Sequence, residues 1–216
     1  MSFYAEKGGD FEICPSGMHL ARCYRLVDIG TQQSEYMGAT KFLHKITLAW
    51  EVHGIDDAGM PIKMLDGRPF GIFKNYTLSW SEKANLRLDL QSWRGKPFNQ
   101  EEMQKFDLKN ILGVWCMLNV IEHVGKNGNT YANIAGISPV PGMIKAAGFP
   151  QPVNPVQLFS LQNPDMVMFE SFSNNLKAKI ESSPEWKKLH APKPSAPMLR
   201  AAPESDPEFD DEEIPF

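Results

Sequence analysis

The chain has 216 residues, 42% of them hydrophobic and 22% charged, an ordinary globular composition that fits one domain with extensions or two small domains. Its three cysteines, its lack of a long apolar run and its start, MSFYAEKGGD, argue against a disulfide framework, a membrane span and a signal peptide, so we expect a cytoplasmic protein. The net charge of −4 is uneven, because residues 201–216 hold seven of the 26 acidic residues and no Lys or Arg. Residues 1–200, with 22 basic and 19 acidic residues, are at +3.

Three strands are predicted in the first third of the chain. Residues 1–17 contain Gly8-Gly9 and Pro15 without a hydrophobic period, which predicts a flexible N-terminus. Strands are expected over 19–29, 41–52 and 68–79, with a polar connection between the first two. The second alternates clearly, which predicts one buried face (Phe42, His44, Ile46, Leu48, Trp50, Val52) and one solvated face (Lys41, Lys45, Thr47, Glu51).

Helical patterns follow these strands. Ser79 and Glu82 have capping-box spacing and predict a helix to about residue 92, with Leu86, Leu90 and Trp93 on its buried stripe and Gly95 as its stop. A second capping pair, Asn99 and Glu102, predicts a short helix over 100–106. Two strands, 110–124 and 129–140, are then joined by a turn with an Asn-Gly signal.

The order of three strands, a helix and two strands predicts a mainly β protein with an OB-fold over residues 18–140. This fold is a five-stranded Greek-key barrel with a helix between strands 3 and 4. An Ig-like sandwich would need more strands and no helix there. A ferredoxin-like fold would need a helix after the first strand, where the sequence has a polar stretch.

The C-terminal third is predicted to extend from this barrel. Residues 141–189 read as a proline-rich arm and an amphipathic helix that begins at Asn163-Pro164-Asp165. The apolar helix face, Phe169, Phe172, Leu176 and Ile180, is expected to pack on the barrel or on a second copy, which leaves a homodimer possible. Residues 190–205 are expected to be a disordered linker, and 206–216 an acidic protein-interaction tail.

Residues 68–98 combine six basic residues with six aromatic ones against only two acids. Single-stranded nucleic acid requires this pairing, since cations follow phosphates and aromatic faces stack on bases at about 1–3 kcal/mol each. The alternative is that the aromatic residues are core and the basic ones merely solvated. Phe70 and Trp93 fit the core better, and Phe73 and Tyr76 have opposite strand parity, so at most one of those two is expected on the wet face.

Candidate nucleic-acid contacts are basic or aromatic residues on one side of the predicted barrel: Arg22, Tyr24, Tyr36, Lys41, Lys45, Phe73, Lys74, Tyr76, Lys83, Arg87, Arg94, Lys96, Lys126 and Tyr131. Arg25 also lies on the first strand, and Tyr36 falls in the first connection. Cys14, His19 and Cys23 lack zinc-site spacing, and no catalytic motif or cofactor-binding loop is present. We therefore expect no metal, no cofactor and no enzymatic activity.

The chain ends in DPEFDDEEIPF, where six acidic residues precede an apolar tip. Such a tail can occupy a basic groove until a longer polyanion displaces it, and its tip can enter a pocket on a partner. An inert solubilising tail would not need an apolar end. The interaction residues are expected to be Asp210, Asp211, Glu212, Glu213, Ile214, Pro215 and Phe216.

This ending resembles that of bacterial single-stranded DNA-binding proteins (SSBs), which finish in acidic residues followed by Ile-Pro-Phe. The body differs from the bacterial SSB body, whereas YTLSWSEKANLRLDLQSWRGKPF and the later YANI resemble bacteriophage-encoded SSBs with an OB-fold. The resemblance covers about residues 18–140 and the tail. It implies ssDNA binding in replication, recombination and repair inside an infected bacterial cell, with partner proteins recruited by the tail.

Two other functions remain open from the sequence. The chain could be an adaptor or decoy that holds host repair proteins through its tail while its body binds no DNA. A nuclease or annealing enzyme is the third hypothesis, which metal-dependent cleavage of an oligonucleotide would support.

Overall fold

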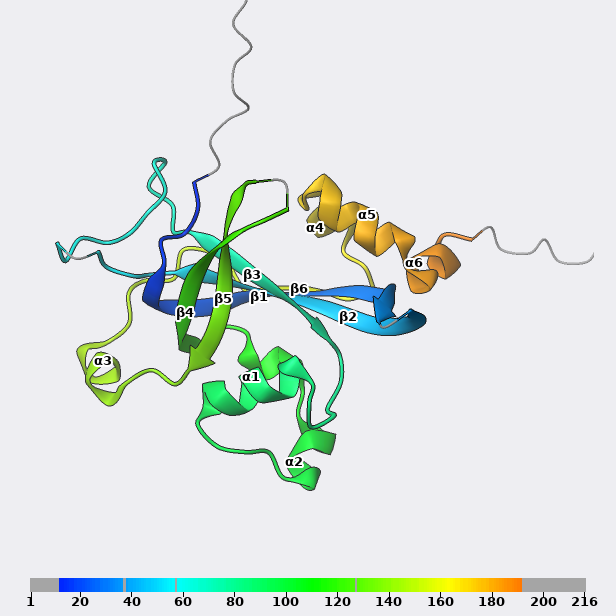
Figure 1. Cartoon of the computed structure of the whole chain (residues 1–216), viewed down its shortest axis with the longest axis horizontal. Coiled ribbons are helices and arrows are strands. Elements are labelled where there is room, and N and C mark those ends of the chain that lie inside the picture. Colours follow the sequence, from blue (N-terminus) through cyan, green and yellow to red (C-terminus); the bar gives the residue numbers. More distant parts are fainter. Residues whose placement is uncertain (1–11, 37, 57, 127, 192–216) are drawn as a thin grey trace, which may run out of the picture.

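The computed structural model describes residues 12–36, 38–56, 58–126 and 128–191 (Figure 1). Its strands are β1 (Gly17–Tyr36), β2 (Ala39–Val52), β3 (Gly71–Thr77), β4 (Trp115–Val124), β5 (Thr130–Ser138) and β6 (Gln157–Phe159). Its helices are α1 (Asn85–Arg94), α2 (Gln100–Lys105), the 3-10 turn η1 (Leu108–Ile111), α3 (Gly142–Ala147), α4 (Met166–Glu170), α5 (Asn174–Ser182) and α6 (Pro184–Leu189).

The strands form one mainly antiparallel sheet, which confirms the predicted mainly β class. The hydrogen-bonded path runs β3-β2-β1-β4-β5, and β6 joins β1 in parallel. The two ends of the path, β3 and β5, approach each other within 8 Å between Cα atoms. Among the described residues they form no ladder, so the sheet is not closed.

A first core fills the inner side of the sheet. Leu48, Trp50 and Val52 of β2 are buried there, as the strand alternation predicts. Helix α1 lies over this core and buries Leu86, Leu90 and Trp93. Figure 1 shows α1 and α2 on one side of the sheet and α4–α6 on the other.

The helix boundaries test the capping predictions. Ser79 and Glu82 do not open α1: its N-cap is Ala84, which makes no side-chain capping bond, because the chain turns through residues 81–83 first. Gly95 ends α1 in the left-handed region at φ 73°, as predicted. The Asn99–Glu102 capping box at the start of α2 is confirmed in both directions.

The predicted polar connection between the first two strands is wrong. β1 and β2 continue as a hairpin through Thr31↔His44 and on to Tyr36↔Ala39. The hairpin extends past the core, so Phe42 is 66% exposed although its parity predicts burial. Polar residues are tolerated in this segment because both faces are largely exposed to solvent.

Residues 141–189 are not an extended arm with one helix. They contain α3, the short strand β6 and three helices, because Ser171 and Ser183 end α4 and α5. The predicted apolar face packs on the chain's own sheet: a second core joins Val27, Ile29, Phe159, Leu161, Phe169, Phe172, Ile180 and Trp186. Leu176 is partly buried against it.

The C-terminal segment also corrects the predicted wet face of β2. Thr47 is 6% exposed and Glu51 is fully buried, because the C-terminal segment covers the outer side of the sheet. Glu51 accepts hydrogen bonds from Arg22 (3.1 Å) and from the backbone and side-chain nitrogens of Asn154 (2.7 and 2.8 Å). The segment before β6 is therefore fastened to the sheet by a buried carboxylate.

Candidate nucleic-acid interface

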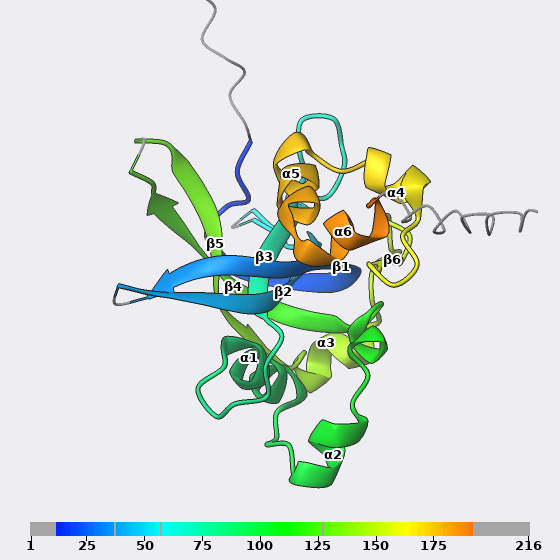
Figure 2. The ribbon, with the colours of Figure 1, turned by 90° about the vertical axis from the view of Figure 1, so that its right-hand side faces the viewer.

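A groove of about 230 Å³ lies between α5 and the outer face of β1–β3. Figure 2 shows α5 above this part of the sheet. The strand register builds the groove wall in rows: Arg25, Ala49 and Phe73 lie side by side across three strands, and Val27, Thr47 and Asn75 form the next row. From the helix side come Ser173, Asn175, Leu176 and Lys179.

A β-bulge shapes the aromatic part of the wall. The pairing of β1 with β2 shifts between Cys23 and Arg25, so Tyr24 is an extra residue, and both Tyr24 and Arg25 line the groove. The Arg25 guanidinium lies 5.2 Å from the Tyr24 ring centroid, and its Nε donates to Gln157 Oε1 at 2.5 Å. Burial raises the pKa of the Tyr24 hydroxyl, which therefore stays neutral at neutral pH.

Phe73 supplies the exposed aromatic surface of the groove. Its side chain is 66% exposed although it sits in the middle of β3. An exposed ring on a sheet surface beside a cationic side chain is the kind of platform on which an unstacked base can stack. Polar groups lie in the neighbouring row, where Thr47 Oγ1 donates to Asn75 Oδ1 at 2.6 Å.

Lysines surround this wall. Lys45 is half-buried and lies two residues before Thr47 on the same face of β2, while Lys41 is exposed farther along the hairpin. Lys179 is exposed on α5 and lines the groove from the other side. Within the described part of the chain these three lysines make no ion pair, so their charges are available for phosphates.

Two predicted contacts belong to the interior instead. Arg22 is 9% exposed and is held by Glu51 and by the backbone oxygen of Asn154 at 3.0 Å. Tyr76 is 2% exposed, so it cannot offer a face to a base. Its hydroxyl donates to Asp89 at 2.8 Å, and burial together with the Asp89 carboxylate raises its pKa strongly. Strand direction explains both. Arg22 points to the face that the segment around Asn154 covers, and Tyr76 points into the first core beneath α1.

The predicted cations near α1 lie away from the groove, and three of the five are engaged. Lys74 Nζ donates to Asp89 at 2.7 Å, and Arg87 Nη1 donates to the backbone oxygen of Trp80 at 3.1 Å. Arg94 pairs with Glu102 at 2.6 Å and stacks over Phe98 at 4.1 Å. Lys83 and Lys96 are exposed.

The remaining predicted contacts are at the hairpin ends. Tyr36 is the last residue of β1 rather than a loop residue. Lys126 and Tyr131 are exposed near the turn between β4 and β5, and Tyr131 pairs with His123 across the hairpin. The seven tail residues 210–216, like the linker 192–205, lie outside the described residues.

Sequence reasoning missed the contribution of Thr47, Asn75 and Lys179. Thr47 was predicted on the solvated face of β2, and nothing in the sequence showed that a helix would cover that face. The signal available for Lys179 was its position off the apolar stripe of its helix, which predicts exposure but not a location beside β3.

Comparison with known proteins adds no assignment, since no protein-family model matches the sequence and no curated protein matches it. The described residues contain no group of three His, Cys, Asp or Glu side chains able to hold a metal ion. Cys14, Cys23 and Cys116 are buried free thiols, and His19 Nε2 contacts the backbone oxygen of Pro15 at 2.8 Å. No helix in the described ranges has both the length and the apolarity that crossing a membrane requires.

Proposed function

We propose that this protein binds single-stranded DNA without sequence specificity through the groove between β1–β3 and α5, and that its body is an OB-fold. The strand path β3-β2-β1-β4-β5, the helix between β3 and β4, and the approach of β3 to β5 support that fold. In such a fold the face of strands 2 and 3 binds oligonucleotides, together with the loops that join strands 1 and 2 and strands 4 and 5.

The observation that carries the proposal is the composition of one groove wall. An exposed Phe73, the Tyr24–Arg25 pair and Lys179 line the same groove, and Lys45 lies beside it on the same face of β2. Stacking of a base on one ring contributes about 1–3 kcal/mol, and the lysines supply a sequence-independent attraction to phosphates. No nucleophile or metal is needed for this function, so no enzymatic step is proposed.

The tail completes the proposed function. Its carboxylates compete with DNA for the lysines of the groove at low salt, and its Ile-Pro-Phe tip recruits replication, recombination or repair proteins when DNA displaces it. The proposed setting is a bacterial cell infected by a phage that encodes the protein, where the groove acts on transient single strands.

The test is fluorescence anisotropy of labelled oligo-dT with the full chain across a salt series. The logarithm of the affinity should fall with the logarithm of salt by about 0.7 for each phosphate contacted. Replacing Lys45 and Lys179 with Ala should reduce that slope by about 1.4 and weaken binding. Lys96→Ala/Lys109→Ala removes the same charge from the segment between α1 and β4 and should change neither.

Two results would reject the proposal. If the full chain shows no binding at low salt, the body is not a DNA-binding surface. Capture of host repair proteins by the tail would then favour the adaptor hypothesis. If only the Lys96→Ala/Lys109→Ala chain loses affinity, DNA is bound on the α1 side instead.

A further inference from the structure

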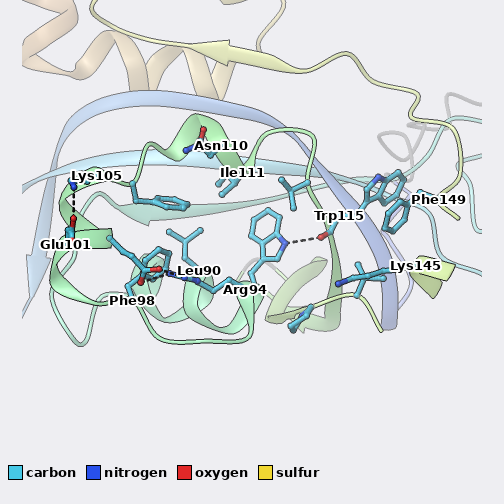
Figure 3. A pocket seen from close by; sticks show the side chains of 16 residues that line it. Leu90, Arg94, Phe98, Glu101, Lys105, Asn110, Ile111, Trp115, Lys145 and Phe149 are labelled. Atoms are coloured by element: carbon cyan, nitrogen blue, oxygen red, sulfur yellow. Dashed lines mark hydrogen bonds and ion pairs between the residues drawn. The ribbon is translucent and has the colours of Figure 1, made fainter. Parts of the chain in front are cut away.

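A second and larger groove, of about 910 Å³, lies on the α1 side of the molecule (Figure 3). It is bordered by α1, α2, α3 and the start of β4. Figure 1 shows these helices on the opposite side of the sheet from α4–α6, so this groove is separate from the proposed DNA groove. Its volume is in the range of pockets that enclose a ligand of a few hundred daltons.

Five of the 16 residues that line this α1-side groove are aromatic. Trp115 and Phe149 stack in parallel, with ring centroids 5.0 Å apart and an angle of 2° between the rings. Trp93 is fixed behind them, because its indole Nε1 donates to the backbone oxygen of Trp115 at 3.1 Å. Phe149 and Val114 remain 41% and 42% exposed. The wall is thus rigid and apolar, and part of it faces solvent.

The charges of the groove leave one cation unmatched. Arg94 pairs with Glu102, and Lys105 pairs with Glu101, both at 2.6 Å. Lys145 of α3 is exposed and makes no ion pair with any described residue. Figure 3 shows Lys145 on the same side of the groove as Trp115 and Phe149. The groove therefore combines an apolar wall with a single available positive charge.

We propose that this groove binds the C-terminal tip of the chain itself, Ile214-Pro215-Phe216. The tip is apolar, and the acidic residues directly before it supply the negative charge that Lys145 can match. Four acids, residues 210–213, precede the tip, and Lys145 is the lining cation that is left to attract them. An apolar segment with adjacent acidic residues matches the groove better than a wholly acidic or wholly apolar ligand.

The chain is long enough for this contact. Residues 192–216 follow the described part and number 25, which span at most about 80–90 Å when extended. A domain the size of residues 12–191 has a radius of gyration of about 16 Å, so the tip can reach any side of it. A tethered segment of this length has an effective concentration on the order of millimolar, so even weak binding would be populated within one chain.

Docking at the α1-side groove adds a third position for the tail, besides the DNA groove and a partner protein. A partner cannot bind the tip while the tip is docked, so docking lowers the apparent affinity of the tip for the partner. The factor is one plus the ratio of the effective concentration of the tip to its dissociation constant for the groove. With both values near 1 mM, that factor is about two. This inference does not depend on DNA binding, because the two grooves share no lining residue.

The test uses the full chain with Ile214→Ala and Phe216→Ala, so that its own tip cannot compete. A synthetic peptide of residues 206–216 is titrated into the ¹⁵N-labelled protein, and the indole N–H signals of Trp93 and Trp115 are followed by NMR. We expect saturable shifts with a dissociation constant near 1 mM or below. A peptide with the same two alanines keeps every charge and should bind at least tenfold more weakly.

Variants of the receptor chain decide where the peptide binds. Phe149→Ala and Lys145→Ala change exposed side chains, so they should leave the fold intact and weaken the peptide at least fivefold. Phe73→Ala removes a similarly exposed ring from the other groove and should have no effect. The proposal is overturned if the peptide produces no shifts at several millimolar, if the alanine peptide binds equally, or if Phe73→Ala rather than Phe149→Ala weakens binding. Oligo-dT titration of the same variants tests the DNA function separately.

Discussion

Replacing Glu51 with Gln should detach the C-terminal segment from the sheet. Glu51 is fully buried and accepts from Arg22 through Oε1 and from Asn154 through Oε2. Arg22 also donates to the backbone oxygen of Asn154, so the three residues form a closed set of contacts. A glutamine keeps one acceptor oxygen, and its amide group must then face either the guanidinium or the Asn154 donors.

The expected loss follows from this geometry. Removing one charge of a buried pair costs about 3–5 kcal/mol, because the other charge stays buried without a partner. Glutamine retains one of the two sets of hydrogen bonds, so we expect the lower end, about 3 kcal/mol in the free energy of unfolding. For a chain of this size that corresponds to a fall in Tm of about 6–12 °C.

The pH dependence gives the effect a signature. Burial raises the pKa of Glu51, but hydrogen bonds from Asn154 and Arg22 and the nearby His53 outweigh it and hold the pKa below its ordinary value. Because the pKa is lower in the folded state, ionised Glu51 contributes fully to the free energy of unfolding above the unfolded pKa of about 4.3. That contribution is lost as the pH falls through the folded pKa. The difference between wild type and Glu51→Gln should therefore shrink on acidification.

Urea denaturation at pH 7 and at pH 3–4 measures both quantities. Asp66→Asn at the exposed Asp66–Arg68 pair is the matched control and should leave the free energy of unfolding unchanged, because solvent screens this pair. A loss below 1 kcal/mol for Glu51→Gln at pH 7, or a loss of equal size at both pH values, would refute the reasoning.

Three further predictions concern the groove and the two cores. Phe73→Ala should weaken oligo-dT binding about 5–150-fold in an anisotropy titration and leave Tm unchanged, since the ring is exposed. Gly30→Ala should lower Tm, because φ is 70° there and a Cβ would lie 2.6 Å from that of Ser183. The thiols of Cys14 and Cys23, whose pKa burial raises to about 11 and about 12, should react with a disulfide reagent only after denaturant is added.

Local patterns predicted the parts of the fold that local physics decides. The alternation from Ile46 to Val52 identified the buried face of β2, and the capping box at Asn99 identified the start of α2. The buried stripe of α1 and its end at Gly95 were also predicted correctly, because the helical period and a left-handed φ depend on neighbouring residues alone. The mainly β class followed from the order of these elements.

Long-range contacts decided what the sequence could not predict. The wet face assigned to Thr47 and Glu51 was wrong because residues about 100 positions later cover it, and no pattern within β2 records that cover. The strand β6 was not predicted for the same reason: its three residues, 157–159, pair with β1 residues more than 100 positions earlier. Of the predicted DNA contacts, Tyr24, Lys45 and Phe73 lie at the groove or beside it. Arg22 and Tyr76 were predicted only because they are basic and aromatic, and the sequence did not show the residues that bury them.

The C-terminal segment therefore has a direct part in defining the site. Val27 and Ile29 of β1 would be exposed on an isolated sheet, and the second core buries them under α4–α6. That packing fixes α5 beside β1–β3, so Lys179 faces Phe73 across a groove rather than open solvent. A strand bound there would contact the sheet and a helix from opposite sides. Loosening the Glu51 anchor should consequently weaken DNA binding as well as stability, although Glu51 itself does not line the groove.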